Sequence, residues 1–456
     1  MTSEKIVRVA NGQGFWGDSL LGPLRLVEEG PVDYLTLDYL AEITMSIMQK
    51  QLARNPKAGY AMDFVAMLER ILPTCKEKGI KVIANAGGVN AKACLEATEE
   101  VIRKLGLNGM KVAIVEGDDI LDRIPELLES GETLKNMDDG RPLRDVQDRI
   151  SSANVYIGAQ PIVEALQQGA DIIITGRASD PSLVVAPLVY EFGWAMDDYD
   201  KLASATVMGH ILECGAQCTG GNFTNWQRLE DMDKIGYPVV EASADGTFVV
   251  TKHDNTGGSV DLETITSQLL YELGDPKNYL GPDCIADFTT IQLEQQGENR
   301  VAVSGVKGRP ATDTYKVSIS FSNGYKILGS LCVPGPDAIA KAEKLADMVW
   351  KRVEKHGYKI PEDKRFVELF GTNVLLKGLV PKNEEPHEVM LRIGAWGDDQ
   401  KALSVMGSEI APLITSGPPG VTGFAGGRPR PAEVVGYWPA LISKDKVPTS
   451  VTVREV

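Results

Sequence analysis

The chain has 456 residues, of which 43% are hydrophobic and 24% are charged, and its formal net charge is −16. This length and composition are typical of a globular protein with two or three domains. The acidic charge and the lack of any basic run exclude an ordinary nucleic-acid-binding protein. No apolar stretch approaches the roughly 18 residues of a membrane-spanning helix, and the N-terminus is polar. With six scattered cysteines that suggest no disulfide framework, we expect a cytoplasmic protein that binds neither nucleic acid nor membrane.

Short β-branched runs alternate with stretches of helical apolar spacing as far as about residue 190. The expected strands are KIVRVA, VDYLTLDYL, KVIANA, KVAIVEG, NVYIGA and DIIITGR, and the clearest helical stretches are 91–105 and 162–169. This alternation predicts an α/β fold, with a mostly parallel sheet of repeated βα units and helices on both faces. The pattern leaves open whether the sheet closes into a barrel.

Glycines and polar residues follow the expected strands. In parallel α/β folds ligands bind beyond the carboxyl ends of the strands, so these loops are candidate parts of one site. Alternatively, the turns need glycine for positive φ and Asp or Asn as helix N-caps. The substrate-binding candidates from these loops are Asn11, Gly14, Asp18, Asn85, Gly87 and Gly88, and the catalytic candidates are Arg177 and Asp180.

The first of these loops, NGQGFWGDS, has the glycine spacing of a dinucleotide-binding loop. Gly12, Gly14 and Gly17 fit G-x-G-x-x-G after a strand, and Asp38 follows about 20 residues on. Trp16, however, stands where the backbone would have to approach a pyrophosphate. We therefore do not predict NAD or FAD.

The segment HILECGAQCTGGNF carries the densest set of reactive side chains. His210, Cys214 and Cys218 are spaced i, i+4, i+8, which on one continuous helix would place them on one face. Three interpretations remain open. They are a soft-metal site, a buried structural cysteine pair, and a Cys214 nucleophile with His210 as its base. The nucleophile would require a lowered thiol pKa, and the glycines after Cys214 indicate that the helix ends there.

The segment TKHDNTGGSV combines a histidine with two adjacent glycines. His253 is a second candidate proton carrier, since His356 and His387 lie among charged residues typical of a surface. The amides of Gly257 and Gly258 are candidate anion-binding groups. The alternative is an ordinary hydrogen-bonded loop.

Beyond about residue 285 the pattern changes to alternating apolar and polar residues with turns, which predicts antiparallel hairpins to about residue 335. An amphipathic helix is expected at 338–353. We place a domain boundary near residue 360, giving a domain at 1–360 and a smaller C-terminal α+β domain at 361–456. Within the latter, the loop 416–431 is rich in Gly and Pro, and Arg428 is a candidate for binding a phosphate or carboxylate.

Several motifs, in order along nearly the whole chain, resemble one family. They are VANGQGFWGDS, DYLAE, NAGGVN, TGRASDPSL, GHILECGAQCTGGNF, TKHDNTGGSV and GVTGFAGGRP. Together they look like the acyclic terpene utilisation protein AtuA family. This resemblance implies a part in bacterial breakdown of branched acyclic terpenoids such as citronellol and geraniol, whose intermediates are acyl-CoA thioesters, alongside biotin-dependent carboxylases. It carries over no catalytic residues.

Taken together, the residues and the resemblance predict a catabolic enzyme of the lyase class. It would add or remove water, or cleave a C–C bond, on a branched acyl-CoA or related carboxylic substrate, with CoA entering only as part of that substrate. Asp180 or His253 would move the proton, Arg177 would hold a carboxylate, and glycine amides would stabilise an enolate oxygen. A divalent cation on the acids Asp18, Asp38, Glu42 and Glu116 is an alternative to this scheme.

The alternative class is a non-catalytic protein that binds acyl-CoA or partners a carboxylase. In either case we expect a small-molecule ligand and a homo-oligomer, as is common for metabolic proteins of this size.

Overall fold

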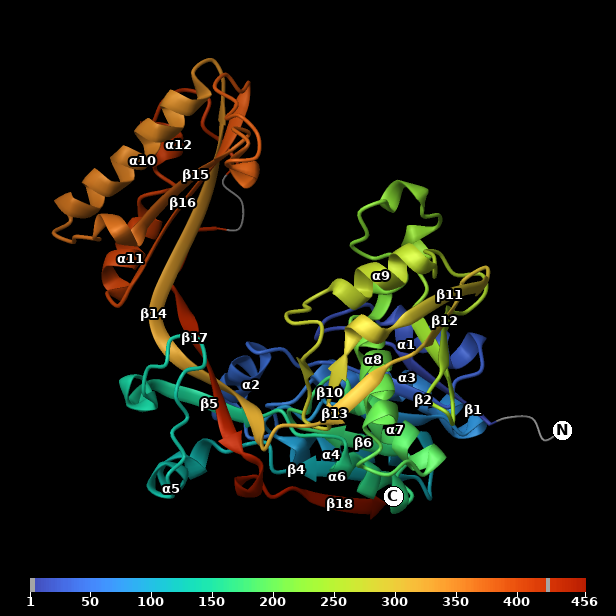
Figure 1. The fold of residues 1–456 in the computed structure, drawn as a ribbon. Helices are drawn as coiled ribbons and strands as arrows, with labels where there is room; N and C mark the ends of the chain where they lie inside the picture. Colours follow the sequence, from blue (N-terminus) through green and yellow to red (C-terminus); the bar gives the residue numbers. More distant parts are fainter. Residues whose placement is uncertain (1–4, 424–426) are drawn as a thin grey trace. The chain divides into compact units, whose positions relative to one another are not determined.

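The computed structural model describes residues 5–423 and 427–456 and divides into two compact units (Figure 1). Unit 1 comprises Met1–Ser320 and Tyr437–Val456, and unit 2 comprises Phe321–Gly436. The boundary predicted near residue 360 lies inside unit 2, and the last segment of the chain belongs to unit 1. Part of the 416–431 loop, residues 424–426, lies outside the described residues.

Unit 1 is built on a large mixed sheet with strand order β11-β12-β8-β7-β1-β2-β3-β6-β4-β18. The pairs from β1 through β2, β3 and β6 to β4 are parallel, and all other pairs are antiparallel. The strands are β1 (Ile6–Asn11), β2 (Tyr34–Leu37), β3 (Lys81–Ala84), β4 (Lys111–Glu116), β6 (Ile172–Thr175), β7 (Pro238–Ser243), β8 (Phe248–Lys252), β11 (Gln292–Gly297), β12 (Arg300–Ser304) and β18 (Ser450–Glu455).

The α/β class is confirmed, with two differences from the expected sheet. The sheet is mixed and not mostly parallel, since the strands on both flanks pair in antiparallel fashion. As described, it runs openly from β11 to β18, so the question of a barrel, which the sequence left open, is answered by an open sheet. The run NVYIGA contributes to β5 (Ile150–Val155), which pairs with β14 (Thr314–Pro334) instead of joining the main sheet. Pairing between segments so distant in sequence depends on tertiary contacts that local periodicity does not report.

Helices cover both faces of the parallel strands. Leu35, Val82 and Ile174 pack into one hydrophobic cluster with residues of α3 (Met62–Lys78) and α4 (Ala91–Leu105). Because side chains alternate along a strand, the neighbouring buried residues Ile83 and Ile173 point to the opposite face. The helices α6 (Gln160–Gln167) and α7 (Ser182–Phe192) contact the strands there, and α7 also packs on α8 (Tyr199–Leu212). The remaining helices of this region are α1 (Leu21–Glu29), α2 (Thr44–Arg54) and α5 (Ile124–Glu129).

Unit 2 contains a second, antiparallel sheet with helices packed against it. Its strands are β15 (Arg365–Phe370), β16 (Glu388–Gly397), the end of β14 and the start of β17 (Ala432–Ser443). The helices α10 (Ala338–Lys355) and α11 (Gln400–Ser408) contact β16, and α12 (Leu413–Ser416) follows. A third, small sheet in unit 1 joins β9 (Tyr279–Leu280), β10 (Cys284–Asp287) and β13 (Lys307–Pro310).

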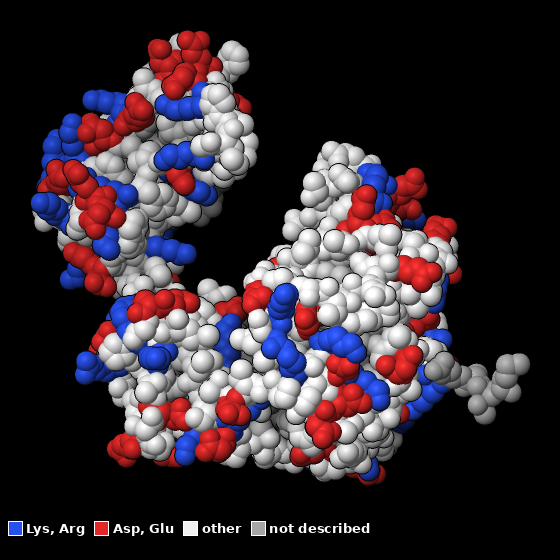
Figure 2. All heavy atoms as spheres, viewed as in Figure 1, with Lys and Arg blue, Asp and Glu red and all other residues white. Residues whose placement is uncertain are grey.

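Charges of both signs are mixed on the face of the molecule shown in Figure 2. On the face shown in Figure 2, Lys and Arg side chains are interspersed with Asp and Glu, so no continuous basic patch forms there. Among the described helices, none combines the length and the apolar character that crossing a bilayer requires.

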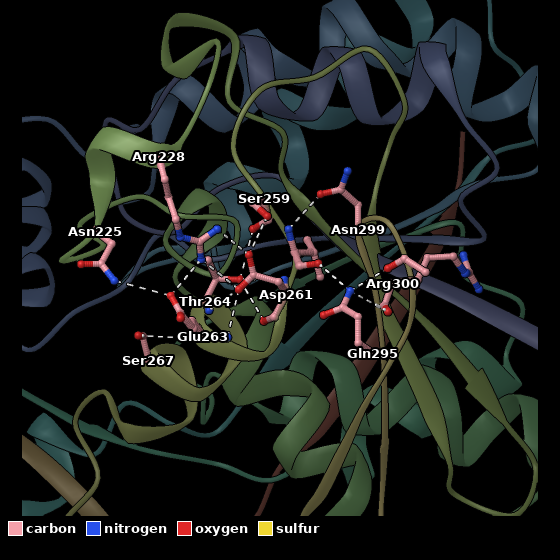
Figure 3. A network of polar contacts seen from close by, with 12 residues as sticks. Asn225, Arg228, Ser259, Asp261, Glu263, Thr264, Ser267, Gln295, Asn299 and Arg300 are labelled. Carbon is pink, nitrogen blue, oxygen red and sulfur yellow. Dashed lines mark hydrogen bonds and ion pairs between the residues drawn. The ribbon is translucent and has the colours of Figure 1, made fainter.

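The segment between α8 and β7, residues 213–237, is fastened to the start of α9 (Leu262–Leu270) by an ion-pair network (Figure 3). Asp261 is the N-cap of α9, and it accepts hydrogen bonds from the amides of Glu263 and Thr264. Arg228 binds the same carboxylate through both terminal nitrogens, at 2.8 and 3.0 Å. One carboxylate therefore both starts a helix and holds a loop that borders the site described below.

We predict that Asp261→Ala lowers the free energy of unfolding by about 1–2 kcal/mol at neutral pH, because it removes the cap and the Arg228 partner. Although burial alone would raise it, the Arg228 guanidinium lowers the pKa of Asp261 to about 2 from 3.8. The stabilisation is therefore complete above the unfolded value and disappears as the pH falls through about 2. Urea unfolding at several pH values measures it.

The matched control is Ser267→Ala, which removes an exposed hydroxyl of the same helix that bonds only the carbonyl oxygen of Glu263. This substitution is expected to change the free energy of unfolding by no more than about 0.5 kcal/mol. Equal losses for the two variants at neutral pH would contradict the structural role given to Asp261.

Candidate functional site

Polar side chains from four neighbouring parallel strands meet at the carboxyl edge of the sheet. Asn11 ends β1, Asp38 follows β2, Asn85 follows β3, and Arg177 comes two residues after β6. Asn85 donates a hydrogen bond to Asp38 at 2.6 Å and accepts one from the amide of Tyr39 at 2.6 Å. Loops that are far apart in sequence are thus joined directly by their side chains.

Arg177 is the buried centre of this edge. Its side chain is only 2% exposed, and it donates hydrogen bonds to Asp180 Oδ1 at 2.7 Å and to the carbonyl oxygen of Leu40 at 2.8 Å. The guanidinium carbon also lies 4.1 Å from the ring centroid of Tyr156. Because its terminal nitrogens are engaged, Arg177 does not offer a free fork to a substrate carboxylate. It holds Asp180, whose side chain is 29% exposed.

The backbone at Arg177 is fixed by a second buried carboxyl. Asp118 Oδ2 accepts hydrogen bonds from the Arg177 amide at 2.7 Å and from Asn154 at 3.0 Å. Burial raises the pKa of Asp118 to about 7. A Cβ on Gly176 would lie 2.2 Å from Asp118 Oδ1, which explains why glycine precedes Arg177.

Asp38 and Asp180 have different environments although they share Arg177 as a neighbour. Asp38 is 6% exposed, and burial together with the negative charge of Asp180 raises its pKa well above the ordinary value. Its Oδ1 accepts hydrogen bonds from Asn85 and the Leu40 amide. Among the described residues its Oδ2 has no partner. The protonated form of Asp38 therefore places its hydrogen on the unpaired oxygen.

His210 and Glu213, at the end of α8, form a buried pair near these acids. His210 Nε2 lies 3.1 Å from the carbonyl oxygen of Gln268 and Nδ1 lies 3.1 Å from Glu213. A carbonyl oxygen only accepts, so Nε2 carries a hydrogen and a further proton lies between Nδ1 and the carboxyl. Burial alone lowers the pKa of His210, but the contact with Glu213 raises it overall, and burial raises the pKa of Glu213.

Cys214 does not have the surroundings of a nucleophile. Both ring nitrogens of His210 contact other groups, and burial together with the charge of Glu213 raises the pKa of the Cys214 thiol to about 12. The helix α8 ends at Leu212, so His210, Cys214 and Cys218 do not share one helical face. The nucleophile and soft-metal interpretations therefore lack the geometry that they require.

His253 lies apart from Arg177 and Asp180. It packs against Gly30 and lines two cavities, of about 170 and 790 Å³, whose other walls come from α1 and strands β7 and β8, and neither cavity is lined by Arg177 or Asp180. Burial lowers its pKa, so it is neutral at neutral pH. His253 is therefore not positioned to exchange a proton with Asp180.

Most candidate glycine amides already have partners. Gly257 donates to the carbonyl oxygen of Lys234, Gly258 to that of Glu230, and Gly87 to that of Thr175. The amide of Gly88, by contrast, donates to no acceptor among the described residues.

The first loop, NGQGFWGDS, is fixed by its own polar residues. Asp18 accepts hydrogen bonds from the Gly14 amide at 3.0 Å and the Tyr237 hydroxyl at 2.8 Å. A Cβ on Gly14 would lie 2.8 Å from the carbonyl carbon of Cys214, and Asn11 donates to the carbonyl oxygen of Leu212 at 2.8 Å. Through Asn11 and Gly14, the first loop packs against the end of α8.

The four acids of the alternative cation site have separate partners. Asp18 bonds Tyr237, Asp38 bonds Asn85, Glu42 accepts from Tyr156 at 3.0 Å, and Glu116 pairs with Lys92 at 3.4 Å. In residues 5–423 and 427–456, no three His, Cys, Asp or Glu side chains gather in an arrangement that would hold a metal ion. The cation hypothesis is therefore not supported. Arg428 is exposed and belongs to unit 2.

Comparison with known proteins identifies the family of the chain. The model of the acyclic terpene utilisation family protein AtuA matches residues 7–453. The chain belongs to the AtuA family. No curated protein and no solved structure gives a significant match. Membership of the AtuA family associates the chain with acyclic terpene utilisation, and the reaction has to be inferred from the site.

Several residues of the site were missed by the sequence reasoning. Glu213 carried a signal, since it follows His210 at i+3 within a helical segment. Tyr156 carried none, because its contact with the Arg177 guanidinium forms only in the folded unit.

We predict that Asp38→Asn stabilises the protein at neutral pH. The raised pKa means that folded Asp38 keeps its proton while the unfolded side chain ionises above about 3.8, so wild-type stability falls as the pH rises through this range. Asparagine does not titrate, so the stability of the variant does not fall in this way. Because each pH unit above about 3.8 costs the wild type about 1.4 kcal/mol while folded Asp38 stays protonated, the variant should be more stable by about 4 kcal/mol at pH 7, with the difference vanishing below about pH 4.

Denaturant unfolding of both proteins across this pH range measures the difference, with Asp148→Asn, at an exposed aspartate, as the control. If the difference in free energy of unfolding between Asp38→Asn and the wild type does not change with pH, Asp38 ionises normally in the folded protein.

Proposed function

We propose that this AtuA-family protein is a lyase of the hydro-lyase kind, acting on a branched acyl-CoA or related carboxylic substrate. The observation that supports this most is the pairing of two carboxyl groups of unlike character at the sheet edge. Asp38 is buried and favours its neutral form, while Asp180 is partly exposed and held by Arg177. Two titratable groups whose environments separate their protonation states are the usual arrangement of an acid and a base.

In the proposed reaction Asp180 removes a proton from the carbon next to the substrate carbonyl. The electron pair of that C–H bond forms the C=C bond as the C–O bond to the hydroxyl group on the next carbon breaks. Asp38 gives its proton to the departing hydroxyl, which leaves as water, and the reverse sequence adds water. Arg177 acts as a positioning residue, because its two hydrogen bonds orient the carboxylate of Asp180.

Charge that develops on the carbonyl oxygen requires a donor. The Gly88 amide is the candidate, since the amides of Gly87, Gly257 and Gly258 already donate within the protein. The pair of His210 and Glu213 holds a further proton beside the acids, which supports a site that exchanges protons.

A non-catalytic acyl-CoA-binding protein is the second candidate, favoured by the direct ion pair of Arg177 with Asp180, which a binding module could use purely for structure. The two candidates differ in proton exchange, since only a catalyst exchanges substrate hydrogen with solvent.

We predict that Asp180→Asn lowers the rate of substrate proton exchange by about 100- to 10,000-fold, because the base is lost. Exchange is measured by NMR in deuterated water with a set of branched hydroxyacyl- and enoyl-CoA thioesters. The matched control, Asp197→Asn, alters an exposed aspartate and should keep the wild-type rate.

Wild-type exchange in Asp180→Asn would remove this residue from the mechanism. A wild-type protein that binds these thioesters without exchanging their hydrogens would support the binding protein instead.

A further inference from the structure

We infer that Lys316, with the rings of Tyr156 and Tyr437, forms a binding site for an anionic oxygen of the substrate, from a carboxylate or a phosphate. This inference rests on the proposed function, because it places the charged end of the substrate next to the Arg177–Asp180 pair. No sequence motif pointed to these three residues.

The geometry joins this cluster to the rest of the site through one ring. Arg177 lies 4.1 Å from the centroid of Tyr156, and the ammonium group of Lys316 lies 4.8 Å from the same centroid. Lys316 is also 5.8 Å from the ring centroid of Tyr437. The Tyr156 hydroxyl donates to Glu42 at 3.0 Å, which fixes the ring between the two cations and this acid.

The two cations differ in what they offer to a ligand. Arg177 is 2% exposed and its terminal nitrogens bond Asp180 and Leu40, whereas the Lys316 side chain is 40% exposed. Lys316 forms an ion pair with Glu42 at 3.6 Å, which is longer than a hydrogen bond, and the Glu42 side chain is 47% exposed. Among the described residues the ammonium group donates no hydrogen bond. The exposed ion pair with Glu42 therefore leaves the ammonium group able to donate hydrogen bonds to an incoming oxygen.

The surrounding charges make such an anchor necessary. Asp180 and Glu42 border the same cluster, so an anionic substrate would be repelled unless a cation compensates. The rings of Tyr156 and Tyr437 hold the lysine through cation–π contacts, which add no negative charge beyond that of Glu42. The ligand class is thus an organic acid or a CoA thioester whose anionic group lies one tyrosine ring away from Asp180.

The test measures binding by calorimetry with three defined probes. They are isovaleryl-CoA, free isovalerate, and the N-acetylcysteamine thioester of isovaleric acid, which carries no charge. Lys316→Met should weaken binding of an anionic probe about tenfold or more and leave the neutral thioester unchanged. A loss confined to the CoA thioester identifies a phosphate, and a loss for isovalerate identifies a carboxylate.

Two variants make the readout specific. Lys316→Arg keeps the charge and should restore most of the affinity, which a purely structural role for the lysine would not predict. Lys326→Met alters an exposed lysine on the same long strand, in unit 2, and should bind all probes like the wild type.

Equal affinities of the wild type and Lys316→Met for the anionic probes would overturn the inference. So would an equal loss for the neutral thioester, or a wild type that binds neither anionic probe at millimolar concentrations. Because binding is measured without turnover, the outcome is separate from that of Asp180→Asn. If a ligand binds through Lys316 but its hydrogens never exchange with solvent, the proposed reaction is refuted and the binding site is supported.

Discussion

The site depends on a guanidinium group that is almost completely buried. A buried charge without partners is strongly unfavourable, so the fold has to supply Arg177 with a counter-charge, a carbonyl acceptor and an aromatic face. Asp180, Leu40 and Tyr156 meet these needs, and Asp118 binds the Arg177 amide. These contacts leave the buried Nε of Arg177 without a hydrogen-bond partner among the described residues, but they join the loops after β2, β4, β5 and β6.

This arrangement also separates the acids of the site into two kinds. Asp180 receives the direct ion pair and remains partly exposed, whereas Asp38 is buried behind it and bonded by neutral amides. Placing a second negative charge at Asp38 would require desolvating it beside Asp180, which is why the neutral form is favoured. The same cost applies to Glu213, which shares a proton with His210. A site rich in carboxyl groups thus carries much less negative charge than its composition suggests.

Features with local signals were predicted well. The helix expected at 91–105 is α4, where Asn90 caps the start and Gly106 ends it with φ of 67°. The residues that follow β1, β2, β3 and β6 do meet at one edge, as expected for parallel strands. The helix carrying His210 ends before Cys214, as the following glycines indicated.

Features that depend on distant pairing were not predictable. The sheet is extended by antiparallel strands on both flanks, and β18, from the end of the chain, pairs with β4. His253 was grouped with Arg177 by residue type alone, but it packs against Gly30 instead. Lys316 and Tyr437 lie close together because β14 begins and β17 ends in unit 1, which no spacing in the sequence reveals.

The protonation state of Asp38 tests the acid–base assignment most directly. Isotope-edited infrared spectroscopy of aspartate-labelled protein distinguishes a protonated carboxyl band from a carboxylate band, and Asp38→Asn assigns it. At neutral pH a protonated band that disappears in Asp38→Asn is the expected result. A spectrum in which Asp38 is already ionised at about pH 5 would contradict the assignment, because both carboxyl groups would then be bases and the site would lack its acid.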